Sequence, residues 1–429
     1  MSEMKTAVTG MGLITPLGID LRENWRNLVE MKTGIGYYPE ERRIENLRYM
    51  GRIQTVELPQ SIPQKLLSQM RFLNRGSLLG FVSAHEAVSR SGIDMQDIPP
   101  DRRALYIASG DLTTVGYDFL FPATKEATEG RWQEIDFEKL NRAALDRINP
   151  FFLLESISNN LFSFLSAFFD CKGPNTCLAS LSPCGMQALE LADGILRQGK
   201  ADMALVVGCG NWITEIPMYE IDGLGMLSKC RHGIESFKPF DRRRDGFIPG
   251  EGGAALLLET LEAASGRGAA ILATIEGMGN CIDFSPDWSL RVPSKVAERS
   301  IRLALNESGS DLKDLAFVNP HGSGTQKGDR SELSSLMDIL NDYRARIPIC
   351  GMKPYTGHLG AASDIAEIIF GILAVQHHMV PATLNFEETE KDFSELDIVG
   401  AHKDCENTHF LTISYGLGGQ SSSVVIKAL

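Results

Sequence analysis

The sequence lacks any apolar run long enough to cross a membrane as a helix. Its most apolar stretch, AALLLETLEAA, is interrupted by acidic residues. The first residues, MSEMKTAVTGMGLITPLG, also lack the charged-then-apolar order of a signal peptide, because Gly, Thr and Pro break the apolar run. We therefore expect a cytoplasmic protein with no membrane partner.

The sequence also lacks C-x-x-C pairs and histidine clusters at zinc-finger spacing. A long chain without a signal peptide favours reduced and mostly buried thiols over disulfides. We expect neither a metal nor a cofactor. The eight cysteines are Cys171, Cys177, Cys184, Cys209, Cys230, Cys281, Cys350 and Cys405.

Basic residues are in the minority, since 42 Lys and Arg face 55 Asp and Glu for a net charge of −13. This balance argues against a broad nucleic-acid-binding surface. It also means that an acidic protein partner would need a local basic patch.

Strand-like and helix-like segments alternate along most of the chain. Several of the strands are apolar throughout, as is typical of strands buried on both faces. We predict strands at LYIAS, MALVVG, AALLLE, ILATIEGM, LAFVNP, IPICG, FLTISYG and SSVVIKA, and helices over 77–92, 185–199, 294–308, 330–341 and 362–378. The alternation predicts an α/β fold in which helices cover sheets.

The segment 173–202 (GPNTCLASLSPCGMQALELADGILRQGKAD) holds the candidate nucleophile. An amphipathic helix follows Ser182, which fits its N-cap, with Pro183 as the first helical residue. Free N–H groups and the helix dipole at that place favour a developing oxyanion, although Ser-Pro is also an ordinary helix start. Cys184 is a rival nucleophile, which we rank lower because a cysteine in the first helical turn is usually inert packing.

Two histidines occupy glycine-rich loops that lie far apart in the sequence. His321 follows a buried strand in NPHGSGTQKGD (319–329), and His358 precedes an apolar helix in GMKPYTGHLGAASD (351–364), together with Lys353. Loops at buried strand ends are where α/β proteins usually place their sites, so the two histidines could meet over one pocket. Each could instead be a structural histidine, and Lys353 a salt-bridge partner. A third glycine turn, in ISYGLGGQSSS (413–423), could present backbone N–H groups.

These segments, in this order and spacing, resemble the elongating β-ketoacyl-acyl-carrier-protein synthases. The resemblance runs from AVTGMGLITPLG near the start through FDRRRDGFIPGEGGA (240–254) to SYGLGG near the end. It implies the α/β thiolase-like fold, five layers in the order αβαβα with two similar halves. We place the halves at 1–260, with the nucleophile position, and 261–429, with the two histidines.

The resemblance also implies roles for individual residues. Ser182 falls where the family has its acyl-accepting cysteine, His321 and His358 match its two histidines, and Lys353 matches a lysine five residues before the second one. In the family, an acyl group moves from a carrier-protein thioester to the nucleophile. Malonyl-carrier protein then loses carbon dioxide while the histidines stabilise the enolate, and the carbanion attacks the acyl group.

Further positions match the gate and the supporting residues of the family. Tyr415 replaces the usual gating phenylalanine, whose backbone N–H shares the oxyanion hole with that of the nucleophile, and Leu417 replaces a second phenylalanine. The supporting residues are Ser323, in place of a threonine, with Thr325, Asp329 and Glu332.

A serine at the nucleophile position alters the chemistry. A cysteine, with an ordinary pKa of about 8.5, becomes a thiolate near a helix N-terminus, whereas a dipole worth on the order of 1–2 kcal/mol does not ionise an alcohol. Ser182 therefore needs a base, which could be His321 or His358. A natural serine and an engineered replacement of cysteine both fit the sequence, although Leu181, Pro183 and Tyr415 favour natural divergence.

Three functions follow. The first is a synthase or acyltransferase of type II polyketide or fatty-acid synthesis that uses Ser182 with a histidine. The second is a chain-length-factor-like partner subunit of a ketosynthase heterodimer, which carries no acyl group. The third is a malonyl-carrier-protein decarboxylase. The partner implied by the resemblance is an acyl carrier protein with phosphopantetheine-bound acyl and malonyl groups.

The resemblance further implies a dimer, either of two copies or with a paralogous ketosynthase. The apolar run NNLFSFLSAFF (159–169) is a candidate interface element. A buried helix within one subunit is the alternative reading of this run.

Overall fold

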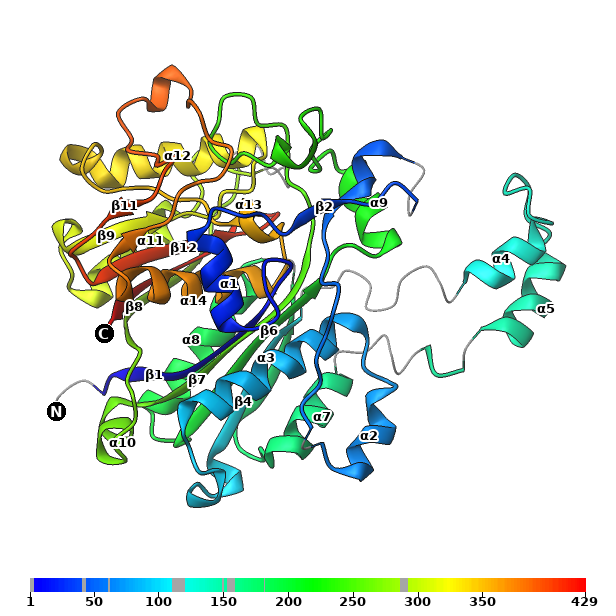
Figure 1. Ribbon diagram of the computed structural model, residues 1–429, viewed down its shortest axis with the longest axis horizontal. Helices are drawn as coiled ribbons and strands as arrows, with labels where there is room; N and C mark the ends of the chain where they lie inside the picture. Colours follow the sequence, from blue (N-terminus) through cyan, green and yellow to red (C-terminus); the bar gives the residue numbers. More distant parts are fainter. Residues whose placement is uncertain are drawn as a thin grey trace.

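The structure is a computed structural model that describes residues 4–40, 44–60, 62–109, 120–148, 150–152, 159–180, 182–285 and 292–429. Its centre is a nine-stranded sheet with the order β5-β4-β6-β7-β1-β8-β13-β12-β9 (Figure 1). In that order the strands are β5 (Asn175–Ala179), β4 (Arg103–Ser109), β6 (Met203–Asn211), β7 (Glu251–Thr260), β1 (Thr6–Ile14), β8 (Ala273–Ile282), β13 (Gln420–Ala428), β12 (His409–Tyr415) and β9 (Leu315–Asn319).

The sheet consists of two halves that share one short seam. β1 pairs with β8 only through Thr6–Val8, whereas it pairs with β7 along nearly its whole length. The first half thus ends at β1 and the second begins at β8. The exact division at residues 260 and 261 stays a prediction.

Helices fill three layers around these two halves. α8 (Cys184–Arg197) and α14 (Ala362–Gln376) contact each other in the middle, and α14 packs on β6 and β7 of one half and on β12 and β13 of the other. α3 (Arg75–Ser91) and α7 (Asn159–Phe169) cover the outer face of the first half, and α11 (Glu298–Ser308) with α12 (Gln326–Leu340) covers that of the second. The thiolase-like αβαβα layering predicted from the resemblance is confirmed.

β7 is apolar throughout because its side chains point alternately into two hydrophobic cores. Ala255 and Leu257 belong to the core beneath α3 and α7, whereas Leu256 and Leu258 belong to the core around α8 and α14. Because successive residues of a strand point to opposite faces, a strand between two helical layers must be apolar on both.

The remaining elements connect these layers or extend from them. The helices are α1 (Leu21–Val29), α2 (Gln64–Met70), α4 (Phe121–Ala127), α5 (Phe137–Arg147), α9 (Glu215–Gly223), α10 (Leu261–Gly266) and α13 (Lys353–Thr356). The short strands form the pairs β2 (Ile35–Tyr37) with β3 (Tyr49–Gly51) and β10 (Met379–Val380) with β11 (Lys403–Asp404). The 3₁₀ helices are η1 (Glu45–Arg48), η2 (Met95–Asp97), η3 (Pro100–Arg102), η5 (Gly233–Ser236), η6 (Leu312–Asp314), η7 (Asn341–Tyr343) and η8 (Lys391–Phe393).

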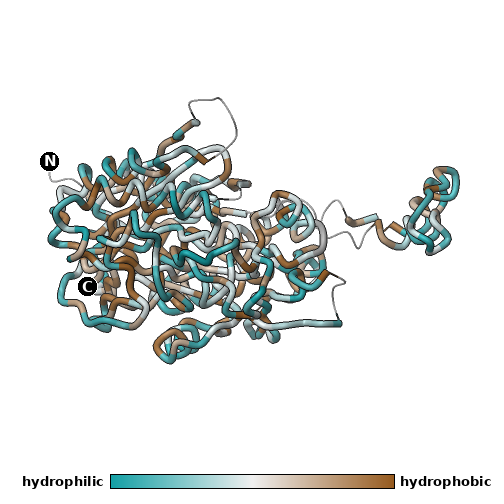
Figure 2. Tube along the Cα trace, turned by 90° about the horizontal axis from the view of Figure 1, so that it is seen from above, coloured by the Kyte–Doolittle hydropathy of each residue, from teal (hydrophilic) through white to brown (hydrophobic). Residues whose placement is uncertain are grey.

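The pair α4 and α5 stands apart from the layered body, as Figures 1 and 2 both show. The apolar residues of the chain gather inside that body (Figure 2). Within the described residues, no helix combines the length and the apolar character that a membrane crossing requires.

Most predicted elements are present, with four informative differences. IPICG (347–351) is not a strand, because Pro348 has no N–H to donate and the segment makes only isolated bridges to Val318 and Ile398. The helix predicted from 294 begins at Glu298, because Ala297 has a left-handed backbone with φ 67°.

The third difference is β1, which the sequence did not reveal because glycines interrupt its apolar pattern. These glycines let α3 approach the strand: a Cβ at Gly12 would lie 2.0 Å from the Ser83 carbonyl oxygen. β5 was missed too, since its residues are only partly buried at the edge of the sheet.

The predicted interface run forms α7. Leu161, Phe164 and Leu165 lie in the core against α3, which agrees with the buried-helix alternative for this face. A role of α7 in a dimer stays a prediction.

Candidate active site

Ser182 lies between β5 and α8 and is 4% exposed. The prediction that it caps the helix is wrong: α8 begins at Cys184, and Pro183, with φ −99° and ψ 46°, occupies the N-cap position. The Ser182 hydroxyl has no hydrogen-bond partner among the described residues. It is a buried alcohol with its donor and its acceptors unused.

The N-terminus of α8 faces a carboxylate from another helix. The backbone N–H groups of Gly185 and Met186 donate to Oδ2 of Asp364, over 3.0 and 3.4 Å. Asp364 lies in the first turn of α14 and is completely buried. Asp364 therefore neutralises part of the positive charge at the start of α8, which reduces the effect of the helix dipole on Ser182.

Cys184 does not compete as a nucleophile. It is fully buried, its Sγ donates to the Ser180 carbonyl oxygen over 3.1 Å, and burial raises the pKa of its thiol far above the usual range. A thiol that stays protonated is a poor nucleophile.

His321 follows β9, and ionisable side chains hold its backbone at both ends. Its N–H donates to Glu332 over 2.7 Å, and its carbonyl oxygen accepts from Lys353 Nζ over 2.6 Å. Its ring Nδ1 lies 3.4 Å from the hydroxyl of Ser414 on β12. Burial, Lys353 and His358 lower the pKa of His321 well below its usual value, so the ring is neutral.

His358 is held by backbone bonds and aromatic rings. Its N–H donates to Ile248 O over 2.9 Å, and its ring stacks on Trp212 at 4.6 Å between centroids and 16° between planes. Nδ1 accepts the backbone N–H of Gly360 over 3.2 Å, which places the ring proton on Nε2. Burial and Lys353 lower the pKa of His358 well below its usual value, so the ring is a neutral hydrogen-bond donor.

Lys353 is a salt-bridge partner inside the protein. Its Nζ contacts the two carboxylate oxygens of Glu367 on α14 at 2.8 and 3.0 Å, and both side chains are nearly inaccessible. Burial raises the pKa of Glu367 to about 7, although the lysine opposes this rise. Lys353 thus connects the backbone of the His321 loop to Glu367 on α14.

The predicted supporting residues form one polar cluster next to the His321 loop. Ser323 contacts Thr325 Oγ1 at 2.8 Å and Asp329 Oδ1 at 3.2 Å, and Asp329 also accepts the N–H of Gly324. Burial raises the pKa of Asp329 to about 6 and that of Glu332 to about 8. These contacts fix the loop that carries His321.

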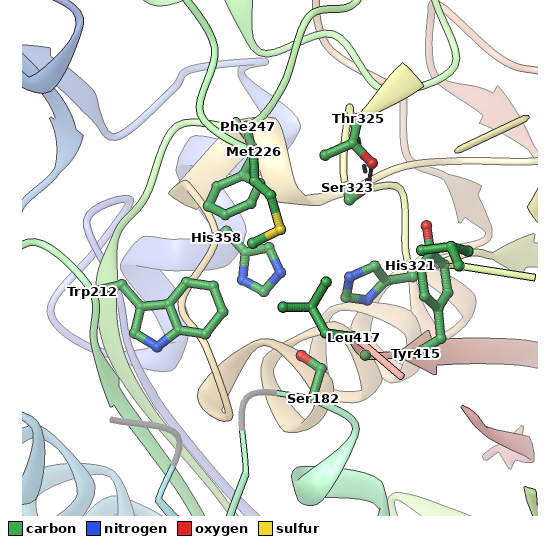
Figure 3. Close-up of a pocket in the computed structure, with 12 residues that line it drawn as sticks. Ser182, Trp212, Met226, Phe247, His321, Ser323, Thr325, His358, Tyr415 and Leu417 are labelled. Atoms are coloured by element: carbon green, nitrogen blue, oxygen red, sulfur yellow. Dashed lines mark hydrogen bonds between the residues drawn. The ribbon is translucent and has the colours of Figure 1, made fainter. Parts of the chain in front are cut away.

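The two candidate gate residues differ in exposure. Tyr415 is 4% exposed; its ring lies 4.5 Å from that of His321, and its hydroxyl occupies the space that a Cβ at Gly328 would need. Leu417 is 43% exposed and lies over Ser182 (Figure 3). Leu417 thus covers Ser182, whereas Tyr415 packs against His321; the gate roles of both residues stay predictions.

Ser182, His321 and His358 line the same pocket, an open space of about 470 Å³. The two imidazole rings lie 5.3 Å apart, and Figure 3 shows both of them, with Leu417, above Ser182. The other walls are mostly apolar: Trp212, Met226, Phe247, Val292, Ser323, Thr325, Tyr415, Gly416 and Leu417. Among the described residues, no cluster of three or more His, Cys, Asp or Glu is arranged to hold a metal ion.

Sequence reasoning missed three polar residues of this site. Glu367 and Asp364 lie three residues apart on α14, whose other residues are mostly apolar, and Ser414 lies on an apolar strand. Acids on one face of an otherwise apolar helix are the signal that could have revealed them, because a buried carboxylate needs a partner.

The sequence profile of the beta-ketoacyl synthase N-terminal domain matches residues 4–264, and that of the C-terminal domain matches residues 272–387. This chain belongs to the β-ketoacyl synthase family. It is 28% identical over 436 residues to the 3-oxoacyl-[acyl-carrier-protein] synthase 2 of Staphylococcus aureus strain N315, covering 100% of this chain and 99% of that protein.

Solved structures share the fold of this β-ketoacyl synthase family member. One is a type II polyketide ketosynthase bound to a hexaketide and in complex with its acyl-carrier protein, and another is the ishigamide ketosynthase/chain length factor. Each has a TM-score of 0.84 at 22% identity and covers 100% of both chains. The family and the thiolase-like fold predicted from the sequence are confirmed, whereas the roles of individual residues stay predictions.

Proposed function

We propose that this chain is a carrier-protein-dependent acyltransferase and condensing enzyme of fatty-acid or type II polyketide synthesis, with Ser182 as the acyl acceptor. The observation that carries the proposal is the meeting of Ser182, His321 and His358 in one pocket of a β-ketoacyl synthase family member. Its full-length similarity to an acyl-carrier-protein synthase supports an acyl carrier protein as the partner.

In the first step, the Ser182 hydroxyl attacks the thioester carbonyl of an acyl-carrier protein. The new Oγ–C bond forms, the C–S bond breaks, and the serine proton passes through a histidine to the leaving thiolate. We expect the oxyanion to bind the backbone N–H of Ser182 together with one from the turn that follows β12.

In the second step, malonyl-carrier protein loses carbon dioxide. His358, with its proton on Nε2, donates to the thioester oxygen as the enolate forms. The carbanion then attacks the acyl-Ser182 ester, which releases the serine. An oxygen ester is a less activated acyl donor than a thioester, so condensation is slower than with a cysteine.

One observation favours a second candidate function, the partner subunit of a ketosynthase heterodimer. The carboxylate of Asp364 at the start of α8 disfavours an anionic group at residue 182. The pair His321 and His358 argues against this function, because a subunit without chemistry does not need two neutral imidazoles in one pocket. The same pair would also serve a malonyl-carrier-protein decarboxylase.

Intact-protein mass spectrometry after incubation with acyl- and malonyl-carrier protein tests the proposal. We expect an acyl adduct on the protein that persists in Ser180→Ala and disappears in Ser182→Ala. Ser180 is the matched control because it lies two residues upstream and outside the pocket wall. The variant Ser182→Cys should condense faster than the parent.

The other outcomes contradict the proposal. Absence of an adduct on the parent protein, with carbon dioxide release that survives Ser182→Ala and is lost in His358→Ala, would identify a decarboxylase. Absence of both activities, together with purification as a complex with a cysteine-bearing paralogue, would identify a partner subunit.

A further inference from the structure

Asp364 is a buried carboxylate beside this pocket with no role in the steps proposed above. It is completely buried, and three donors converge on it: the N–H groups of Gly185 and Met186 on Oδ2, and the hydroxyl of Ser414 on Oδ1 over 2.7 Å. Because each donor offers hydrogen to it, its two oxygens act only as acceptors. Burial raises the pKa of Asp364, while the hydrogen bonds and Lys353 oppose that rise.

The bond from Ser414 to Asp364 has a consequence for His321. A serine hydroxyl has one hydrogen, and Ser414 places it on Asp364 Oδ1. The Ser414 oxygen can then only accept from its other neighbour, Nδ1 of His321 at 3.4 Å. The proton of the neutral His321 ring therefore lies on Nδ1, and Nε2 carries a lone pair.

The second histidine has the opposite arrangement. His358 accepts the Gly360 N–H at Nδ1, so its own proton lies on Nε2. One pocket thus holds a neutral imidazole that can accept a proton and another that can donate a hydrogen bond. Only the first suits an alcohol nucleophile, because Ser182 must lose a proton as it attacks.

We propose that Asp364, acting through Ser414, is a positioning residue that holds His321 with its proton on Nδ1, so that Nε2 accepts the proton of Ser182 during acyl transfer. This inference rests on the proposed function for its chemical step. In that step the Ser182 oxygen bonds to the acyl carbon, its proton moves to Nε2, the thioester C–S bond breaks, and the imidazolium returns the proton to the leaving thiolate.

The hydrogen bonds from Asp364 through Ser414 to His321 form a relay. The variant Asp364→Asn tests this relay, because backbone N–H groups fix the orientation of the new amide. The N–H groups of Gly185 and Met186 require the amide oxygen at the Oδ2 position, which leaves the NH₂ group facing Ser414. The Ser414 oxygen must then accept from the amide, and its hydrogen turns to Nδ1 of His321. The ring proton moves to Nε2, and His321 becomes a donor instead of a base.

The decisive measurement is the ¹⁵N–¹H NMR spectrum of histidine-labelled protein, with the His321 signals assigned by His321→Gln. We expect the Nδ1–H tautomer for the parent protein and the Nε2–H tautomer for Asp364→Asn. The Nε2–H tautomer in the parent protein would overturn the inference without any Asp364 variant. An unchanged tautomer in folded Asp364→Asn would overturn it as well.

The rate of Ser182 acylation by an acyl-pantetheine thioester gives the second readout. We expect Asp364→Asn to lower this rate about 100-fold, less than the loss of about 10⁴ that the same change causes in Ser–His–Asp triads with direct contact. Ser423→Ala is the matched control, since Ser423 is an equally buried serine on β13 whose hydroxyl contacts Ser300. An acylation rate of Asp364→Asn equal to that of the control would contradict the relay.

The two readouts separate this inference from the proposed function. A parent protein that takes up no acyl group contradicts the proposed function and with it the chemical step, whatever the tautomer. A parent protein that is acylated but holds His321 as the Nε2–H tautomer contradicts the relay alone.

Discussion

The two histidine loops reach the same pocket but are built in different ways. Ionisable side chains hold His321, whose backbone lies between Glu332 and Lys353 and whose ring faces Ser414. His358 is held by main-chain bonds and by the stacked ring of Trp212. The two imidazole rings, whose centroids lie 5.3 Å apart, therefore have different surroundings.

From this difference we propose that the two histidines act in different steps of the reaction. A ring coupled to the Asp364 carboxylate through Ser414 is suited to accept and return a proton, because that carboxylate stabilises the imidazolium that forms. A ring packed between aromatic walls, with Nδ1 occupied, is suited to offer one fixed hydrogen bond. Variants of each loop should therefore affect different steps of the reaction.

The largest expected effect separates the two histidines by reaction step. His321→Ala should slow acylation of Ser182 by about 10²–10⁴-fold, the usual contribution of a general base. His358→Ala should change acylation by less than about tenfold but slow decarboxylation of malonyl-carrier protein by about 10²–10³-fold, the usual cost of a lost oxyanion donor. Adduct formation by mass spectrometry and release of carbon dioxide measure the two steps.

Equal losses in both steps for both variants would contradict this division of labour.

The next effect concerns the stability of the His321 loop. Lys353→Met leaves Glu367 without its buried partner and should lower the free energy of unfolding by about 3–5 kcal/mol. The double variant Lys353→Met with Glu367→Leu should recover part of this loss. Urea denaturation followed by circular dichroism measures both.

Lys403→Met is the matched control, because the Lys403–Asp397 pair is partly exposed and should contribute less than about 1 kcal/mol. A loss for Lys353→Met no larger than that of this control would show that the ion pair does not hold the loop.

The smallest effect is a pH dependence on the same loop. Burial raises the pKa of Glu332 from 4.5 to about 8, so the folded state binds this proton more tightly than the unfolded state. The stability from this group is complete below about pH 4.5 and is lost as the pH rises through about 8. Between about pH 5 and pH 9, the parent protein should therefore lose more stability than Glu332→Gln.

Thermal unfolding of both proteins across this pH range measures the difference, and Glu406→Gln, at an exposed glutamate, controls for the substitution itself. Parallel curves for the parent and Glu332→Gln would contradict the assigned role of Glu332.

Much of the fold was predictable from local pattern. Strands such as β6 and β7 are apolar at every position because both faces are covered, and α8 and α14 follow from helical periodicity and length. β1 was not predicted because glycines interrupt its apolar pattern. These glycines let α3 pack closely on the strand, and a local sequence pattern does not reveal such a contact.

The amino-acid sequence was enough to predict the layered α/β fold, the family, and the segments that carry Ser182, His321 and His358. These features depend on local patterns and on the order of motifs along the chain. Three features became visible only in the folded chain: Pro183 rather than Ser182 precedes α8, Leu417 lies over the serine, and Asp364 joins α8 to Ser414. The physical reason is distance along the chain: Gly185 and Asp364 are 179 residues apart, and only the packing of α8 against α14 brings that buried carboxylate to its donors.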